Sequence, residues 1–190
     1  MGRLNDLAEQ IGKEKMPPVH LWKPVHVGEI DIRIDTQGFW FHEGDPIARE
    51  ELVKLFASIL WHEYDQHYLV TSAEKLAIEV ADSPYVIHQM EHITEQGQEA
   101  WAAVTNTHEQ LIIGEENPVE LRRYQEQWVP YVNVRYDLWA RVNRSIYYQW
   151  VNAAMDALEK RSHKQESQTS CSEKLVLSSI GYEFEVARDE

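Results

Sequence analysis

The sequence predicts an α+β fold of two small domains that arose by internal duplication. Residues 30–35, IDIRID, and residues 132–137, VNVRYD, match in residue type at six positions. Each copy continues through a tryptophan, Trp40 or Trp139, then an arginine and an amphipathic helical stretch. Alternating apolar residues in both copies predict β-strands, and turn residues between further strand-like segments predict hairpins. Each half is therefore expected to combine antiparallel hairpins or a sheet with one main helix.

Three segments are expected along the chain. Residues 1–27 are predicted to form an arm, with a short helix at LNDLAEQI followed by a proline-rich extended stretch. Residues 28–90 are predicted to form the first repeat domain and residues 91–190 the second. Within the second, the polar residues 162–173 are typical of a flexible segment, and a hairpin closes the chain.

The first domain is expected to begin with a strand from Gly28 whose isoleucines share one face, followed by the turn DTQG and the return strand FWFHEG. Asp45 then predicts a helix N-cap and Pro46 a first helical residue, with the helix running to about Leu60. Spacings of three and four predict its buried stripe to be Leu52, Val53, Phe56, Ile59 and Leu60. The segments HYLVTS and EKLAIEVAD predict a second hairpin.

The second domain is expected to start with a connecting strand, YVIHQMEHI, and a hairpin of EAWAAVTNT with EQLII. Residues 114–130 contain many polar residues and are predicted to be irregular. The strand VPYVNVRYD then leads into LWARV and a helix over about residues 143–160. Its predicted core side is Ile146, Tyr147, Trp150, Val151, Ala154 and Leu158.

Composition limits the classes of function. The formal net charge of −14 repels phosphate backbones, so general nucleic-acid binding is disfavoured and an anionic ligand needs a locally basic pocket. The single cysteine, Cys171, cannot form an internal disulfide, which fits a reducing compartment. Neither a signal peptide nor a membrane-spanning stretch is apparent in the sequence. A cytoplasmic protein without membrane insertion is therefore expected.

Eight short motifs in order resemble a bacterial family, domain-of-unknown-function 1285: GEIDIRI, a tryptophan strand, GDPIAREELVKLF, YLVTSAEK, ADSPYV, VTNT, PYVNVR and NRSIYYQ. The resemblance covers about residues 26–155. It implies a duplicated α+β core of two small domains, with the second superficially similar to pleckstrin-homology domains. It also implies a site for a nucleotide-like ligand between the domains and a role in signalling, without an established activity. Two features depart from the family pattern: Ser72 stands where the family has proline, and GEENPVE is an acidic insert.

The equivalent strand arginines, Arg33 and Arg135, are the first candidate ligand-binding residues. One interpretation is an ordinary cross-strand ion pair on the solvent face of each strand. The other is that the two strand faces meet across the domain interface and bind phosphate or carboxylate oxygens through their guanidinium groups.

Six further residues complete the candidate ligand site. Arg49 and Arg144 are expected near the starts of the two helices, where the helix dipole disfavours positive charge. Either a nearby acidic side chain or a bound anion would offset the charge of each arginine. Lys75 follows a hairpin turn and becomes a candidate through the family motif. The others are Thr105 and Asn106, which otherwise serve local turn bonding, and Tyr131, which with Trp139 and Tyr148 is a candidate platform for stacking a ligand base.

The sequence does not predict a metal site, a cofactor or a catalytic centre. His62 and His67 lie five residues apart, so they do not match the H-E-x-x-H zinc motif. His88 and His92 lie four apart, in a stretch that reads better as strand. Motifs for nucleophilic hydrolases, P-loops and dinucleotide binding are absent from the sequence. Enzymatic activity is therefore unsupported.

Three functions are compatible with these features. The leading hypothesis is a ligand-binding module that holds a small anionic, nucleotide-like molecule between its halves. The first alternative is a protein-interaction adaptor whose acidic surface docks a basic partner. The second is an enzyme of unrecognised type, which requires at least a histidine and a carboxylate within hydrogen-bonding reach in a cleft.

Overall fold

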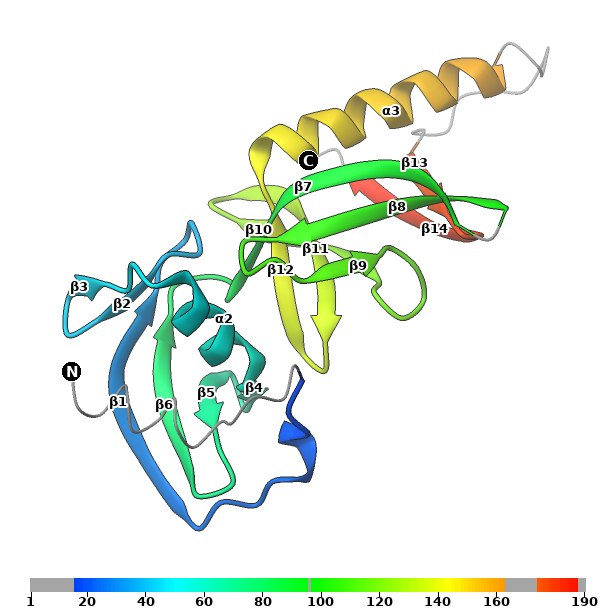
Figure 1. Cartoon of the computed structure of the whole chain (residues 1–190). Coiled ribbons are helices and arrows are strands. Elements are labelled where there is room, and N and C mark those ends of the chain that lie inside the picture. The colour runs from blue at the N-terminus through cyan, green and yellow to red at the C-terminus, as the bar shows by residue number, and fades with distance from the viewer. Residues whose placement is uncertain (1–15, 96, 163–173, 188–190) are drawn as a thin grey trace. The chain divides into compact units, whose positions relative to one another are not determined.

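The computed structural model describes residues 16–95, 97–162 and 174–187 (Figure 1). They divide into two units, and each unit is described by itself. The first holds the described residues up to Tyr85 together with Arg135–Leu138, and the second holds the others. The predicted helix LNDLAEQI lies outside the described residues, as do residues 163–173 of the predicted flexible segment.

The first unit is built on a six-stranded sheet with the order β3-β2-β1-β6-β5-β4. A 3-10 turn, η1 (Val19–Leu21), precedes it. Its strands are β1 (His26–Ile34), β2 (Trp40–His42), β3 (Asp45–Pro46), β4 (Leu60–Glu63), β5 (Gln66–Val70) and β6 (Glu74–Val80). Strands β1 and β6 pair in parallel, whereas β1–β2, β2–β3, β4–β5 and β5–β6 are antiparallel pairs. A parallel pair needs a crossover connection, and the chain between these strands, which includes helix α2 (Glu50–Ser58), supplies it.

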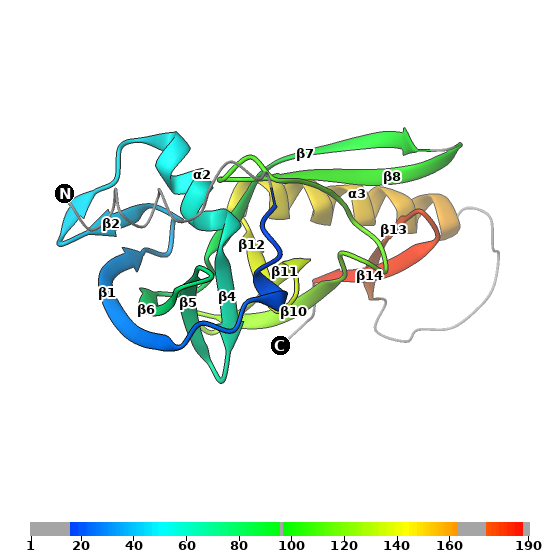
Figure 2. The same ribbon diagram turned by 60° about the horizontal axis from the view of Figure 1, so that its bottom comes forward.

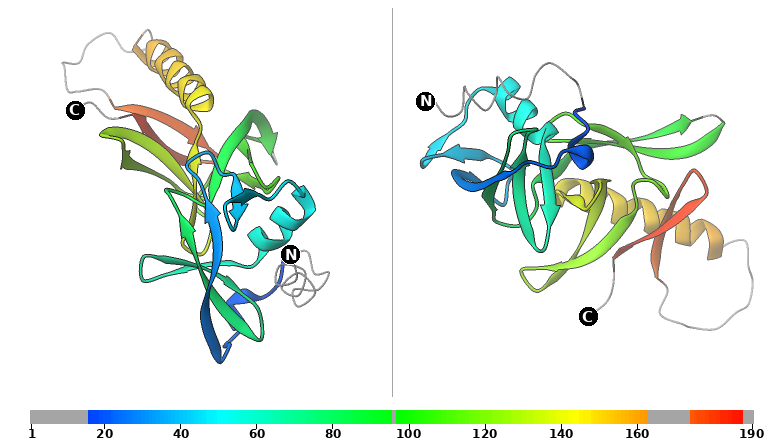
Figure 3. Two further views of the ribbon diagram at one scale, coloured as in Figure 1. Left: turned by 90° about the vertical axis from the view of Figure 1, so that its left-hand side faces the viewer. Right: turned by 90° about the horizontal axis from the view of Figure 1, so that it is seen from below.

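The core of the first unit follows the predicted alternation. Ile30, Ile32 and Ile34 are all buried on the inner face of β1. Helix α2 lies over one face of the sheet (Figure 3), and its Phe56 ring lies 6.3 Å from the ring of Trp40. The hairpins β1–β2 and β5–β6 are both as predicted.

The predicted start and end of the first helix are wrong. Asp45 and Pro46 form the short edge strand β3, which pairs with β2, and α2 begins four residues later at Glu50. A proline is tolerated at a sheet edge because its missing N–H is not needed for a ladder hydrogen bond. At the other end, Ile59 follows the helix, and Leu60, the predicted last residue of the helix, is the first residue of strand β4. Of the predicted stripe, Phe56, Ile59 and Leu60 are buried, whereas Leu52 and Val53 are partly exposed.

The second unit contains a six-stranded sheet that curves into a half-barrel, with the order β10-β11-β12-β7-β8-β9. Its strands are β7 (Tyr85–Glu95), β8 (Gln98–Thr105), β9 (Gln110–Ile112), β10 (Val119–Tyr124), β11 (Gln127–Arg135) and β12 (Leu138–Val142). Helix α3 (Arg144–Ser162) runs beside the hairpin of β13 (Leu175–Ser179) and β14 (Tyr182–Ala187) (Figures 1 and 2). A curved sheet with one long helix is the layout that the family resemblance implies for this half.

Residues 114–130, predicted to be irregular, instead contain β10 and the start of β11, which pair as an antiparallel hairpin. The two turn residues, Gln125 and Glu126, have φ values of 47° and 66°. Tight hairpin turns of this kind need positive φ and favour glycine, asparagine or aspartate. The sequence does not predict this hairpin because neither turn residue is glycine, asparagine or aspartate.

The two units repeat the same order of elements. In the first, the antiparallel pair β1–β2 leads through the small β3 to α2 and then to the hairpin β4–β5. In the second, β11 and β12 are neighbours joined by a short turn, and they lead to α3 and then to the hairpin β13–β14. The α+β fold and the duplicated layout are therefore confirmed.

The start of α3 is also as predicted. Asn143 precedes the helix, and its Oδ1 accepts a hydrogen bond from the backbone N–H of Ile146 at 3.0 Å. On the predicted core side, Ile146, Trp150 and Ala154 are buried. None of the helices in the described ranges is long and apolar enough to cross a membrane.

Candidate functional site

Arg33 and Arg49, two predicted ligand-binding arginines of the first unit, stand on different elements. The Arg33 guanidinium stacks over the ring of Phe41, its cross-strand neighbour on β2, at 4.5 Å from the ring centroid. Arg49 is exposed and is the residue before α2. The cross-strand contact of Arg33 is thus of the ordinary structural kind, made with an aromatic ring.

Arg135, the counterpart of Arg33, holds the end of α2. Its Nη2 donates hydrogen bonds to the backbone oxygen of Ala57 at 2.6 Å and to the Tyr85 hydroxyl at 2.7 Å. The Tyr85 hydroxyl donates to the same oxygen at 3.0 Å. A cation near the last carbonyls of a helix is favoured by the helix dipole. Arg135 therefore has a structural role in the first unit.

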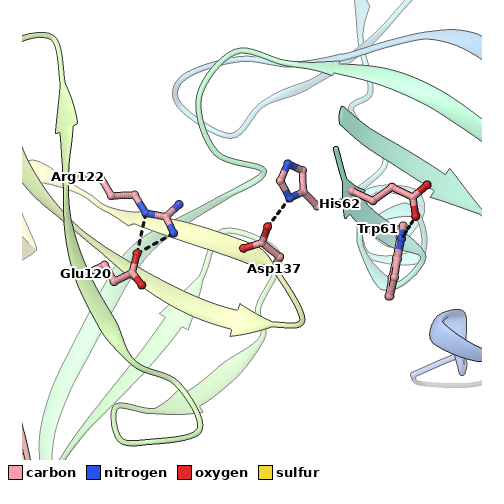
Figure 4. Close-up of polar contacts among 6 residues, drawn as sticks. Trp61, His62, Glu120, Arg122 and Asp137 are labelled. Carbon is pink, nitrogen blue, oxygen red and sulfur yellow. Dashed lines mark hydrogen bonds and ion pairs between the residues drawn. The ribbon is translucent and has the colours of Figure 1, made fainter. Parts of the chain in front are cut away.

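Lys75 is paired with the carboxylate of Glu63. Its Nζ forms an ion pair with Glu63 and lies 4.1 Å from the centroid of the Tyr68 ring. The Trp61 indole N–H donates to the other Glu63 oxygen at 3.0 Å (Figure 4). The hydrogen bond from Lys75, followed by that from Trp61, lowers the pKa of Glu63. Lys75 lies opposite Val27 in the register of β1 and β6, whereas Arg33 lies opposite Glu79, so about 13 Å of β6 separates the two positions.

Thr105 and Asn106 serve the β8–β9 turn and the start of β7. The Thr105 hydroxyl is buried and accepts a hydrogen bond from the backbone N–H of Glu109 at 3.0 Å. Asn106 Oδ1 accepts one from the backbone N–H of Val86 at 3.0 Å, and the Asn106 N–H donates to the Val86 oxygen at 2.8 Å. These contacts correspond to the local turn bonding that the sequence offered as the alternative to ligand binding.

Two of the three proposed stacking platforms are covered by protein. Tyr131 is only 4% exposed. The guanidinium of Arg122 lies 3.8 Å from the Trp139 ring centroid and 5.6 Å from that of Tyr131, and it is fixed by hydrogen bonds to Glu120 (Figure 4). The third platform, Tyr148, is half exposed, and the Arg144 guanidinium lies 5.5 Å from its ring centroid.

A groove in the second unit brings Arg144 and Tyr148 together. It has a volume of about 610 Å3 and lies between the β10–β11 turn, the end of β12 and the first turns of α3. This volume is in the range of small-molecule sites. Its lining residues are Tyr124, Gln125, Gln127, Trp128, Val129, Arg141, Val142, Arg144, Tyr147 and Tyr148. We call it the arginine groove.

The charge of the arginine groove differs from that of the whole molecule. Arg141 and Arg144 line it, and among the described residues that line it there is no carboxylate, although the chain has a net charge of −14. Arg144 Nη2 donates to the Tyr148 hydroxyl at 3.0 Å, and the Arg141 guanidinium lies 4.5 Å from the Tyr124 ring centroid. Aromatic contacts thus help to position both guanidinium groups.

Tyr147 adds a hydrogen-bond donor to the wall of the groove. Burial raises the pKa of its phenol, and the neighbouring Tyr148 raises it further. The hydroxyl therefore stays protonated at neutral pH and can donate to an anion. Tyr147 is predicted on the core side of α3, but the residue is only partly buried. Arg141, Tyr124 and Trp128 are not among the predicted site residues, because their proximity depends on the unpredicted β10–β11 hairpin.

A second polar cluster lies in the first unit. His62 Nδ1 lies 2.7 Å from Asp137 Oδ2 (Figure 4), and the His62 ring lies 4.5 Å from that of His67. This pair places a histidine and a carboxylate within reach, but Asp137 is exposed and neither residue lines the arginine groove. Across the described ranges, no three metal-ligating side chains are close enough to hold an ion.

The partly buried His67 predicts a pH dependence of stability. Burial, and then the nearby His62, lowers the pKa of His67 to about 4, although Asp137 opposes the shift. In the unfolded chain the pKa is about 6.5. Above that pH, His67 is neutral in both states and the free energy of unfolding is not reduced. As the pH falls towards about 4, the unfolded chain binds a proton that the folded chain does not, so the free energy of unfolding falls by about 2 to 3 kcal/mol. Denaturant unfolding across this window should show a shallower pH dependence for His67→Asn than for the wild type.

Substitution of an exposed histidine provides the control for this measurement. His88 lies in the second unit and is exposed, so His88→Asn should keep the wild-type pH dependence. An unchanged slope in His67→Asn would show that His67 is not held neutral by the fold.

Comparisons with known proteins agree with this architecture. The model of the N-terminal domain of DUF1285, a domain of unknown function, matches residues 17–83, and that of the C-terminal domain matches residues 84–185. A crystal structure of a DUF1285 family protein from Silicibacter pomeroyi DSS-3 is 36% identical, with a TM-score of 0.72 over 78% of this chain and 82% of that one. One from Shewanella baltica OS155 is 24% identical, with a TM-score of 0.53 over 64% of this chain and 90% of that one, and shows a similar fold. No curated protein matches the chain. On these matches, the chain belongs to the DUF1285 family.

Proposed function

We propose that the protein is a ligand-binding module that takes up a small anionic, nucleotide-like molecule, and that the arginine groove receives the anion. The observation that carries the proposal is a groove of about 610 Å3 lined by Arg141 and Arg144 in a protein of net charge −14. An acidic protein attracts an anion only where basic groups are concentrated. Guanidinium groups are suited to phosphate because they can donate two parallel hydrogen bonds.

The aromatic walls favour a ligand with a flat ring. Tyr148 is half exposed, and Trp128 is another large, partly exposed ring that lines the groove. Stacking of a base on such a ring contributes about 1 to 3 kcal/mol. A cytoplasmic setting and a role in signal transduction are further parts of the proposal, which derive from composition and the family resemblance. A protein-interaction role for the acidic surface stays the alternative.

Thermal unfolding with a panel of nucleoside phosphates, sugar phosphates and inorganic phosphate tests the proposal. A ligand present at about 100 times its Kd stabilises the folded state by about 2.7 kcal/mol, which raises the Tm by several degrees. The double variant Arg141→Gln/Arg144→Gln should lose this rise, because the anion loses both guanidinium partners.

The matched control is Arg49→Gln, which removes an exposed arginine outside the groove and should respond like the wild type. If no member of the panel raises the Tm, or if the double variant responds as fully as the control, the arginine groove is not an anion site.

A further inference from the structure

The first turns of α3 place three hydrogen-bond donors along one wall of the arginine groove. Arg144, Tyr147 and Tyr148 all line the groove and belong to this helix. Residues three and four positions apart lie on the same face of a helix, so α3 alone sets the positions of these side chains relative to one another. What the three side chains leave unbonded therefore shows what kind of ligand this wall can hold.

The Arg144 guanidinium is only partly used by the protein. Its Nε and Nη2 donate hydrogen bonds to the Tyr148 hydroxyl at 3.3 and 3.0 Å. A guanidinium carries five N–H donors, so three of them remain, and no described residue accepts a hydrogen bond from these three. Within the described part of the chain, the positive charge of Arg144 is thus held in place by a neutral hydroxyl and not by a carboxylate.

The two tyrosine hydroxyls are further donors. The Tyr148 oxygen accepts both hydrogen bonds from Arg144, so its own O–H is left to donate, and it has no acceptor among the described residues. The Tyr147 hydroxyl likewise has no hydrogen-bond partner in the described ranges, and burial raises its pKa. A ligand at this wall must therefore supply acceptor atoms and negative charge.

A terminal phosphate suits this set of donors better than a bridging phosphate does. A phosphate monoester has three free oxygens and a charge between about −1.5 and −2 at pH 7. A phosphodiester has two free oxygens and a single negative charge. Coulomb energy is proportional to the charge of the anion, so the monoester gains more from Arg141 and Arg144 than the diester does.

We propose that the ligand of the arginine groove carries a terminal phosphate group, as nucleoside monophosphates and polyphosphates do, and that phosphodiesters such as cyclic nucleotides bind much more weakly. This inference rests on the proposed function, because it specifies the ligand of the same groove. Arg144, Tyr147 and Tyr148 donate to the free oxygens of the phosphate. Arg141, near the end of β12, adds positive charge. The third free oxygen, which a diester uses for its second ester bond, is the group that the groove distinguishes.

Isothermal titration calorimetry with the full chain tests the inference on two matched pairs of compounds. One pair is adenosine monophosphate and its methyl ester, and the other is phenyl phosphate and methyl phenyl phosphate. At about pH 8 the two monoesters carry two negative charges, whereas their methyl esters carry one. Each monoester should bind more than about ten-fold more tightly than its methyl ester, because the ester has lost both a charge and an acceptor.

The same titrations at about pH 5 separate the effect of charge from that of the added methyl group. The second pKa of a phosphate monoester is about 6, so at the lower pH both members of a pair carry a single charge. The ionisable groups in the described lining of the groove are Tyr124, Arg141, Arg144, Tyr147 and Tyr148. None of them is a histidine or a carboxylate. The preference for the monoester should therefore fall below about three-fold.

A tyrosine variant locates the donors. Tyr147→Phe removes one hydroxyl donor and keeps the ring, so it should weaken binding of adenosine monophosphate more than about three-fold. The matched control is Tyr64→Phe, which makes the same change at a tyrosine of the first unit that is 94% exposed and outside the groove. This control should bind like the wild type.

Three results would overturn the inference. Equal affinity for monoester and methyl ester at pH 8, lost in Arg141→Gln/Arg144→Gln, would reject the terminal phosphate but keep the groove as an anion site. A preference that is as large at pH 5 as at pH 8 would assign it to the bulk of the methyl group. Absence of binding by all four compounds would count against the terminal phosphate and the proposed anion site together.

Discussion

Replacing Trp150 by alanine is expected to destabilise the second unit by about 3 to 5 kcal/mol. Trp150 lies on α3, is fully buried, and packs against Phe184 of β14 with 5.1 Å between ring centroids. The cost combines the lost burial of a large ring with the cavity that it leaves. Hydrogen exchange is the suitable measurement, because it reports the opening free energy of the α3 amides separately from those of β1.

Two further substitutions at this helix isolate the cause. The indole Nε1–H of Trp150 has no hydrogen-bond partner among the described residues, so Trp150→Phe removes an unsatisfied donor and should cost clearly less than alanine. Gln149→Ala, on the exposed side of the same turn, should change stability by less than about 0.5 kcal/mol. A similar loss from Trp150→Ala and Gln149→Ala would contradict the placement of α3.

Phe56→Ala is expected to have an effect of the same size in the first unit. Phe56 is fully buried on α2 and its ring contacts that of Trp40. Phenylalanine to alanine changes in cores cost about 3 to 5 kcal/mol. The loss should appear as faster exchange of the amides of β1 and β6, which form the sheet that α2 covers.

Lys54 supplies the matched control within α2. It is exposed and pairs with Glu50 one turn earlier at 2.8 Å. Exposed pairs of this spacing contribute about 0.3 to 0.5 kcal/mol, so Lys54→Ala should have a small effect. If Phe56→Ala were as mild as Lys54→Ala, the core of the first unit would be built differently.

The parts of the fold that could be predicted are those with a strong local signal. The isoleucines of β1 alternate, and β1 forms as expected because its buried face needs no distant partner to be recognised. Asn143 caps α3 because its side chain reaches the helix backbone locally. The internal duplication was visible for the same reason, since both copies keep the strand and helix patterns.

The elements that were not predicted depend on contacts between distant segments, which leave no pattern in the local sequence. Asp45 and Pro46 carry a helix-start signal, but pairing with β2 turns them into an edge strand. Gln125 and Glu126 adopt positive φ without the usual turn residues, so the β10–β11 hairpin was not recognised. The parallel pairing of β1 with β6 joins segments about forty residues apart, and loop closure on that scale leaves no local pattern.

The candidate site was predicted in part for the same reasons. Arg144 and Tyr148 could be proposed because they lie at the start of a recognisable helix and share a helical face. Arg141 lies at the end of β12, and its contact with Tyr124 depends on the β10–β11 hairpin, which was not predicted. Arg135 was expected to face a ligand, but its guanidinium bonds to the end of α2, a contact that spans 78 positions in sequence.

The most direct test of the arginine groove follows the indole N–H signals of the tryptophans by NMR during titration with the phosphate compound that raises the Tm most. The signal of Trp128, assigned by Trp128→Phe, should shift and saturate, because Trp128 lines the groove, whereas that of Trp61 in the first unit should stay in place. A saturating shift of Trp61 with no change at Trp128 would contradict the account.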